Sequence, residues 1–396
     1  MIQGKTFKDK YFCSSPFNSL FIDVHGGVSS CCSGTYTWGN HLNRNPKEPK
    51  RTIKEIINSE DAQNIRDDIA NAKINSYCDG CAKEENIFGL SQRGHFDRVK
   101  INPNKFELRT LDLRWSNLCN FSCIYCDEDF SSSWAKKKGM GLNKENVTSQ
   151  KQIFELIEES ADTIEKIMLA GGEPLLQMQN DKLLDIVRKD TNITIITNLG
   201  VELEKSNIFK KLKDFDNIIW AVSMENVGEQ FEYVRQGGNW DRMKNNLELI
   251  KNTNPNHNYN FLSVMNILSL SQLHEFVSFS NEVEIPITWQ YINGNGDVLH
   301  PEMFSKNVKD YLINKIETIP TFEKYVEFNK QSLTSLSDKI KNSKDFANWE
   351  EVKEEDIDLD FRKYINIQDS QYNELSKGFG ELWPELDKLI QKPTLI

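Results

Sequence analysis

All eight cysteines of this 396-residue chain lie in its first third, and none follows Cys126. They form two groups, the second of which is one short loop. Disulfides do not persist in a reducing compartment, so we interpret both groups as ligands of a metal or of a redox cluster. The first group is Cys13, Cys31, Cys32, Cys78 and Cys81, and the second is Cys119, Cys123 and Cys126.

The composition is that of a globular protein and excludes several classes of partner. Hydrophobic residues make up 38% of the chain and charged residues 27%. The longest apolar run, FLSVMNILSL, is shorter than the roughly 18 residues of a membrane span, and the first residues lack the apolar core of a signal peptide. The net charge of −11 disfavours binding to nucleic acid. We therefore expect a cytoplasmic protein with no membrane partner.

The second cysteine group reads NLCNFSCIYC, with three and then two residues between the cysteines. Three thiolates on one loop can converge on a single ion or cluster. A structural zinc site needs four ligands, and the preceding histidine, His95, lies well upstream. A 4Fe–4S cluster held by Cys119, Cys123 and Cys126 would leave one iron open for a substrate or cofactor.

This loop resembles the CxxxCxΦC signature of radical S-adenosylmethionine (SAM) enzymes, with Tyr125 at the aromatic position. A second element, GGEP at Gly171, Gly172, Glu173 and Pro174, follows a β-like run and resembles the GGEP element of the same family. The resemblance implies a SAM site. The glycines would let the backbone approach the ligand closely, and the glutamate or nearby backbone groups would accept from the methionyl ammonium group.

The order of predicted strands and helices agrees with that family. Helix-like segments with apolar spacing alternate with the strands, which argues for a parallel sheet. The resemblance implies an α/β fold built on a partial (β/α)6 TIM-type barrel, with ligands at the carboxyl ends of the strands. The segments that we expect to contain strands are FELRTLDLRW, IEKIMLAGGEPLL and residues 193–200, 218–240, 258–268 and 285–294.

Four further residues, at predicted strand ends or in the polar segment after a strand, are candidates for SAM contacts. The resemblance assigns Ser223 to the ribose and Arg235 to the carboxylate, which a guanidinium binds bidentately. Thr197 and Asn198 lie at the end of another strand. Each has a structural alternative, because strand-end Ser, Thr and Asn commonly form turns and an arginine can be a solvated helix charge.

The first cysteine group is predicted to form a separate four-thiolate site. FIDVHGGVSSC indicates a tight hairpin that brings Cys13 and Cys31 together. A single helix is expected over 52–72, followed by the CxxC pair Cys78 and Cys81. With either Cys31 or Cys32 as the fourth ligand, this site could hold zinc.

The same pattern resembles the Twitch or SPASM modules that bind auxiliary 4Fe–4S clusters in radical SAM enzymes. The resemblance favours Cys31 as the ligand and an iron–sulfur cluster over zinc. We therefore predict a small Cys-rich hairpin and helix module over 1–100, a barrel core over 101–300, and a helical extension over 301–396.

The function implied by these resemblances is reductive cleavage of SAM to a 5′-deoxyadenosyl radical that abstracts a hydrogen atom from a substrate. A reduced flavodoxin or ferredoxin would supply the electron. The sequence analysis favours oxidation or modification of a peptide or protein side chain, assisted by the auxiliary cluster. A small-molecule dehydrogenase is the alternative, and a non-catalytic zinc-stabilised binding protein remains open; no catalytic base is assigned.

Overall fold

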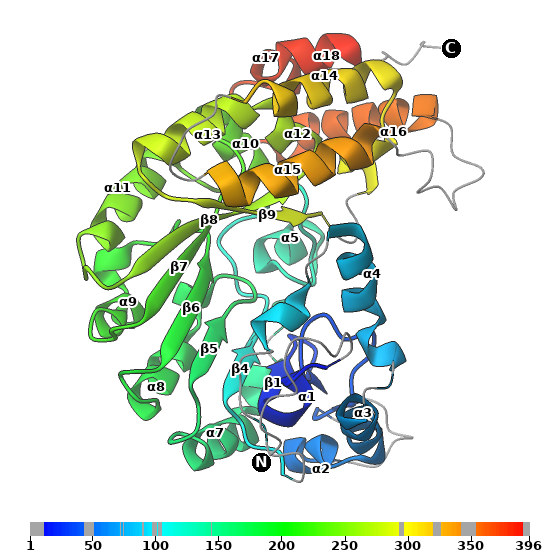
Figure 1. The fold of residues 1–396 in the computed structure, drawn as a ribbon. Coiled ribbons are helices and arrows are strands. Elements are labelled where there is room, and N and C mark those ends of the chain that lie inside the picture. Colours follow the sequence, from blue (N-terminus) through cyan, green and yellow to red (C-terminus); the bar gives the residue numbers. More distant parts are fainter. Residues whose placement is uncertain are drawn as a thin grey trace.

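The computed structural model describes residues 12–42, 51–71, 73, 75–88, 91–96, 101, 105–143, 145–292, 297–319, 326–341 and 354–390. Within these residues the chain forms one nine-stranded sheet in the order β3-β2-β1-β4-β5-β6-β7-β8-β9. Figure 1 shows this curved sheet, with the C-terminal helices gathered at one end of the molecule. The α/β class expected from the sequence is confirmed.

The central part of the sheet consists of six parallel strands. They are β4 (Thr110–Leu113), β5 (Lys166–Leu169), β6 (Asn192–Thr197), β7 (Ile218–Ser223), β8 (Asn258–Met265) and β9 (Ile287–Tyr291). Each strand pairs with the next one along the chain, so their carboxyl ends lie at one edge. This arrangement is the partial (β/α)6 barrel that the sequence predicts.

Amphipathic helices cover the outer face of these strands (Figure 1). They are α7 (Gln150–Glu159), α8 (Met178–Ile186), α9 (Asn207–Leu212), α11 (Trp240–Lys251) and α13 (Leu273–Glu282). Phe261 of β8 contacts Phe276 and Phe279 of α13, and Trp220 of β7 contacts Phe209 of α9. Because side chains alternate along a strand, the neighbours of Phe261 and Trp220 face the inner side of the barrel.

The N-terminal segment adds three strands to the same sheet. They are β1 (Ser19–Ile22), β2 (Gly27–Ser29) and β3 (Gly39–Asn40), and β1 and β2 form the predicted antiparallel hairpin. Asp23 Oδ1 accepts from the backbone N–H groups of His25 and Gly27, which fixes the turn. On its other side, β1 pairs in parallel with β4, from Ser19 opposite Thr110 to Ile22 opposite Leu113.

The prediction of a single helix over 52–72 is wrong, because the structure has two helices in this segment. Helix α2 (Ile53–Ile57) ends before α3 (Glu60–Ala70) begins. Ser59 is the N-cap of α3, and its side chain accepts from the backbone N–H of Ala62. The chain continues through η1 (Ser76–Cys78), α4 (Asp79–Phe88) and η2 (Gln92–His95).

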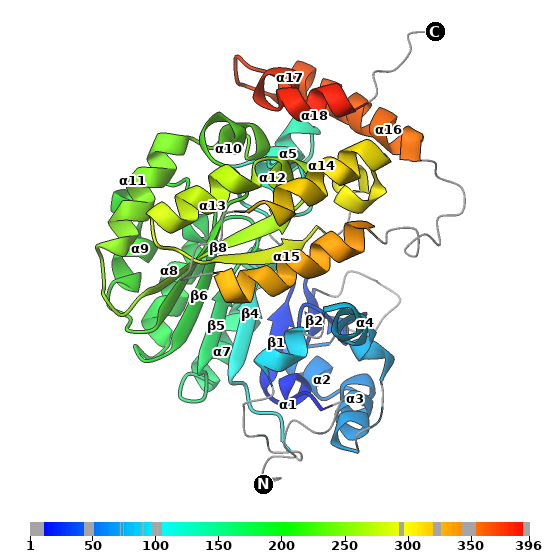
Figure 2. The ribbon, with the colours of Figure 1, turned by 45° about the horizontal axis from the view of Figure 1, so that its top comes forward.

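The C-terminal region is helical, as expected, and packs over the barrel end (Figure 2). It contains α14 (Lys306–Glu317), α15 (Val326–Lys341), α16 (Glu354–Ile367), the π-helical turn η8 (Gln368–Tyr372), α17 (Phe379–Leu382) and α18 (Pro384–Leu389). None of the helices that the structure describes has the length and apolar character of a membrane span. The division at residues 100 and 300 stays a prediction.

Candidate iron–sulfur and SAM sites

The loop that carries Cys119, Cys123 and Cys126 leaves the carboxyl end of β4, and a serine-rich helix start holds it in place. Ser132 Oγ accepts from the Cys119 N–H, and Ser133 Oγ donates to the Cys119 carbonyl. The indole N–H of Trp134 donates to the Cys123 carbonyl at 2.7 Å. These residues begin α5 (Ser132–Lys137). These hydrogen bonds therefore hold the backbone of the loop without using its three thiol groups.

Gly171 and Gly172 bring the end of β5 against the cysteine loop. Both have positive φ angles, +81° and +53°. A Cβ atom on Gly172 would lie 2.3 Å from the Leu118 carbonyl oxygen, and one on Gly171 would lie 2.7 Å from the Cβ of Arg114. In the structure, these glycines allow a close approach to the backbone of Leu118 and to the side chain of Arg114. Their contact with SAM stays a proposal.

Glu173 is fully buried and links the ends of β5 and β6. Its Oε1 accepts from Thr197 Oγ1 at 2.8 Å and from the Leu175 N–H, and its Oε2 accepts from the Asn198 N–H at 2.8 Å. Burial raises the pKa of the carboxyl group to about 7, although these hydrogen bonds oppose the shift. Asn198 Nδ2 lies 3.7 Å from Cys119 Sγ, so the set formed by Glu173, Thr197 and Asn198 contacts the cysteine loop.

Arg235 lies beside the cysteine loop, where its main partner is a residue that sequence reasoning missed. Its Nε and Nη2 donate to the two carboxylate oxygens of Glu225 at 2.8 and 2.6 Å. Tyr125 Oη also donates to Glu225, and Arg235 Nη1 lies 3.7 Å from Cys123 Sγ. Arg235 and Glu225 are both buried. In the sequence, Glu225 is marked only by its position just after β7, close to Ser223, which we predict to contact SAM.

Ser223 is the last residue of β7, and its side chain is half-buried. The structure thus places five residues that we predict to contact SAM around the cysteine loop in hydrogen-bonded sets, with Ser223 at the adjacent strand end. The five are Tyr125, Glu173, Thr197, Asn198 and Arg235. The two glycines contact the start of that loop. Whether each of them touches SAM stays a proposal.

Burial controls the acidity of the three thiols. It raises the pKa of Cys119 to about 12, that of Cys126 well above its usual range, and that of Cys123 in the same direction. Each cysteine therefore retains its proton until a metal replaces it. Soft thiolate ligands of this kind suit iron–sulfur clusters and zinc.

The C-terminal extension docks on the cysteine loop through one face of α16 and η8. Tyr364 Oη donates to the Ile124 carbonyl, between Cys123 and Cys126. Tyr372 packs edge-on against Trp134, with ring centroids 5.1 Å apart. Four residues before Tyr372, Gln368 accepts from Gln236. The spacing 364, 368 and 372 places these side chains on the same side of the helix.

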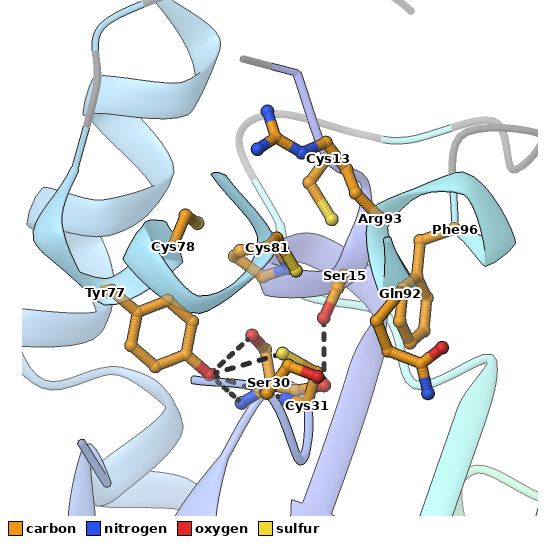
Figure 3. A pocket seen from close by; sticks show the side chains of 12 residues that line it. Cys13, Ser15, Ser30, Cys31, Tyr77, Cys78, Cys81, Gln92, Arg93 and Phe96 are labelled. Carbon is orange, nitrogen blue, oxygen red and sulfur yellow. Dashed lines mark hydrogen bonds between the residues drawn. The ribbon is translucent and has the colours of Figure 1, made fainter. Parts of the chain in front are cut away.

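The first cysteine group meets at a small pocket between the hairpin and α4 (Figure 3). Cys13, Cys31, Cys78 and Cys81 all line it, whereas Cys32 is exposed. Burial raises the pKa of Cys31 and raises that of Cys78 to about 11, and the nearby Arg93 opposes the shift at Cys78. The structure therefore brings together the four cysteines predicted as one ligand set.

Within the described residues, no three His, Cys, Asp or Glu side chains surround one point as the ligands of a single metal ion would. Thiolates bound to different irons of a cluster do not have to meet at one point. Both all-thiol groups fit iron–sulfur clusters in the chemistry of their donors.

Two family models match the chain. The radical SAM superfamily matches residues 113–279, and an iron–sulfur cluster-binding domain, SPASM, matches residues 13–82. The chain therefore contains a radical SAM domain and, ahead of it, a SPASM-type iron–sulfur cluster-binding domain. Its cofactors are accordingly a 4Fe–4S cluster with SAM, and an auxiliary iron–sulfur cluster.

The curated relatives match only part of this chain. "Probable GTP 3',8-cyclase" of Methanococcus maripaludis (strain C7) is 26% identical over 238 residues, which is 53% of this chain and 75% of the relative. "7-carboxy-7-deazaguanine synthase" of Clostridium acetobutylicum is 35% identical over 112 residues, 27% of this chain and 47% of the relative. The solved structure "Native anSMEcpe with bound AdoMet" is 18% identical, with a TM-score of 0.38, and the match covers 53% of this chain and 59% of that one.

Proposed function

We propose that this chain is an enzyme that reductively cleaves SAM and uses the resulting 5′-deoxyadenosyl radical to abstract a hydrogen atom from a small molecule. The observation that carries the proposal is the three-thiol loop at the carboxyl edge of the parallel strands, directly beside the buried Glu173 and Arg235. The cluster and SAM supply the radical chemistry when bound, and the protein supplies orientation and shielding.

The choice of a small molecule replaces our sequence-based preference for a peptide. Both relatives named above carry names of enzymes that form small molecules, which supports the alternative that we had ranked second. The inner face of the barrel also suits such a substrate. The strand residues that point to this face are half-buried and include both polar and apolar side chains, whereas the residues between them point outward and are buried. The half-buried residues include Thr194, Ile196, Ser223, Asn260, Leu262, Val264 and Thr288.

The chain's own residues would act by binding and positioning. Cys119, Cys123 and Cys126 would hold three irons. Arg235 is held in a fixed orientation by Glu225 and would place a positive charge beside the sulfur of Cys123. Glu173 would keep the ends of β5 and β6 together below the SAM site through Thr197 and Asn198. The docked C-terminal helices would exclude water from one side of the loop.

The electron would come from a reduced flavodoxin or ferredoxin, and we keep the cytoplasm as the proposed location. All eight cysteines lie in the described residues, and none of them forms a disulfide there. Such thiols persist in a reducing compartment.

The test is reconstitution of the full chain under anaerobic conditions. We expect about eight irons per chain, as two 4Fe–4S clusters require, and release of methionine and 5′-deoxyadenosine after reduction with SAM present. The triple variant Cys119→Ala, Cys123→Ala and Cys126→Ala should lose SAM cleavage and keep about four irons. The matched control Cys32→Ala should keep SAM cleavage and about eight irons per chain. A colourless zinc protein without cleavage would overturn the proposal.

The substrate class is tested separately by isotope transfer. Deuterated small molecules, beginning with GTP, and deuterated peptides are each incubated with the reduced enzyme and SAM. Deuterium should enter 5′-deoxyadenosine from a small molecule. Transfer from peptides alone would restore the peptide substrate and leave the SAM chemistry intact.

A further inference from the structure

Tyr77 joins the two halves of the four-cysteine pocket. It directly precedes Cys78, yet its side chain extends to the hairpin and ends beside Cys31 (Figure 3). The residue is only 1% exposed. A Cβ atom on Gly34 would lie within 2.4–2.6 Å of the Tyr77 ring and hydroxyl, so the loop after Cys31 packs directly on this tyrosine. The backbone adds a further link, because the Thr35 N–H donates to the Tyr77 carbonyl.

The hydroxyl group of Tyr77 has four neighbouring groups at the hairpin, two from Ser30 and two from Cys31. The Ser30 N–H donates to it at 3.0 Å, and the Cys31 N–H points to it at 3.4 Å. Ser30 Oγ lies at 3.0 Å and Cys31 Sγ at 3.9 Å. A phenol oxygen has two lone pairs and one hydrogen. Because the two backbone N–H groups use the lone pairs, the hydrogen is directed to Ser30 Oγ or to the Cys31 sulfur.

We propose that Tyr77 is a positioning residue that donates a hydrogen bond to Cys31 in the metal-bound state and thereby raises the reduction potential of the auxiliary cluster. A thiolate is a stronger acceptor than a serine hydroxyl because it carries charge. A donor to a ligand sulfur stabilises the more negative, reduced cluster.

The same contact distinguishes the two adjacent cysteines. Cys32 is exposed and does not line the pocket, although its Sγ lies 3.9 Å from Nε2 of Gln92, which does. Of these two cysteines, only Cys31 lies beside the buried hydroxyl of Tyr77. Cys31 is therefore the fourth ligand, alongside Cys13, Cys78 and Cys81. This inference rests on the proposed four-cysteine ligand set and is independent of the substrate.

The experiment isolates the auxiliary cluster in the full chain by using the triple Cys119→Ala, Cys123→Ala, Cys126→Ala background. An electron paramagnetic resonance redox titration then measures its midpoint potential. We expect Tyr77→Phe to make the midpoint more negative. The control Tyr259→Phe removes a hydroxyl that donates to the Ile250 carbonyl in the barrel, and it should leave the midpoint unchanged. Equal midpoints for Tyr77→Phe and the parent protein would overturn the proposal.

Two further variants keep the proposal testable if Tyr77→Phe loses its cluster. Fluorotyrosine at position 77 retains the ring and makes the hydroxyl a stronger donor, so the midpoint should become more positive. An unchanged midpoint would contradict the proposed hydrogen bond. In the same background, Cys31→Ser should lose the cluster iron and Cys32→Ser should retain it. The reverse result would overturn the ligand assignment, whereas loss of all iron from the parent would refute the cluster site itself.

Discussion

The guanidinium group of Arg235 binds the Glu225 carboxylate through two nitrogens, and its third nitrogen lies 3.7 Å from the sulfur of Cys123. Both side chains are buried, so neither charge is compensated by solvent. The pair also receives the hydroxyl of Tyr125, the aromatic residue of the cysteine motif. One ion pair thus connects the end of β7, the turn after α10 (Gly228–Val234) and the cysteine loop.

Removal of one member of this pair should destabilise the apo-protein strongly. We expect Glu225→Leu to lower the free energy of unfolding by about 3–5 kcal/mol, because it leaves the Arg235 charge buried and unpaired. Adding Arg235→Met should restore part of the loss, since the uncompensated charge is then gone. Urea unfolding of Glu225→Leu, Arg235→Met and the double variant measures these effects. A double variant whose loss equals or exceeds the sum of the single losses would contradict the expected coupling.

The close contact between Gly172 and Leu118 predicts a position-specific effect of alanine. Gly172→Ala should lower stability by more than Gly139→Ala, although both glycines have positive φ angles. A Cβ on Gly139 would meet no atom within 4 Å, so that variant should cost only the roughly 1–2 kcal/mol of left-handed backbone. The difference between the two unfolding free energies reports the contact with the cysteine loop. Equal losses would mean that the loop moves aside freely.

The contact between Tyr364 and Ile124 predicts that the C-terminal helices protect the SAM-binding cluster. Tyr364→Phe leaves the Ile124 carbonyl without its hydroxyl donor, which should cost about 1–3 kcal/mol. We expect faster removal of this cluster's iron by a chelator, measured by absorbance in the reconstituted protein. Tyr311→Phe is the control, because Tyr311 lies on α14 and its hydroxyl donates to Glu385. Identical chelation rates for the two variants would argue against a protective role.

Because His41 is buried, we expect the free energy of unfolding to decrease in mild acid. Its Nδ1 accepts from Gln152 Nε2, and its Nε2 donates to Asn146 Oδ1, both at 2.8 Å. Burial lowers its pKa below the usual 6.5. Between that lowered value and about 6.5 the unfolded chain binds a proton that the folded chain does not, so stability is retained above pH 6.5 and falls as the pH decreases.

Thermal unfolding at pH 5.5 and 7.5 tests this expectation. The difference in Tm between the two pH values should be smaller for His41→Gln than for the parent protein. His274→Gln is the control, because His274 lies on α13 and contacts the Lys315 carbonyl. A difference unchanged by His41→Gln would assign the acid sensitivity to other groups.

Local patterns predicted most of the fold. The six strands, the hairpin at Gly26 and the clustering of Cys13 with Cys31 follow from signals within a few residues of one another. The break at Ser59 was missed because the apolar spacing continues from Ile53 to Ile69, whereas capping by one serine decides where the second helix begins. Tertiary packing and capping chemistry override the periodic pattern there.

The parts of the site that escaped prediction depend on contacts between distant residues. Glu225 is defined by Arg235 and by Tyr125, which lies 100 residues earlier in the chain. Nothing near Glu225 in the sequence distinguishes it from a surface carboxylate. The parallel pairing of β1 with β4 joins segments about 90 residues apart, and the docking of Tyr364 on the cysteine loop spans 240 residues.

The parallel pairing of β1 with β4 also constrains electron transfer. Ser29 lies opposite Phe21, so the hairpin returns Cys31 toward the start of β1, whereas the SAM loop follows Leu113, the partner of the last residue of β1. The two cysteine groups therefore lie toward opposite ends of one hydrogen-bonded strand pair. A hinge motion between the two groups would have to break this pairing, so we expect electrons to pass over a fixed distance between clusters bound there.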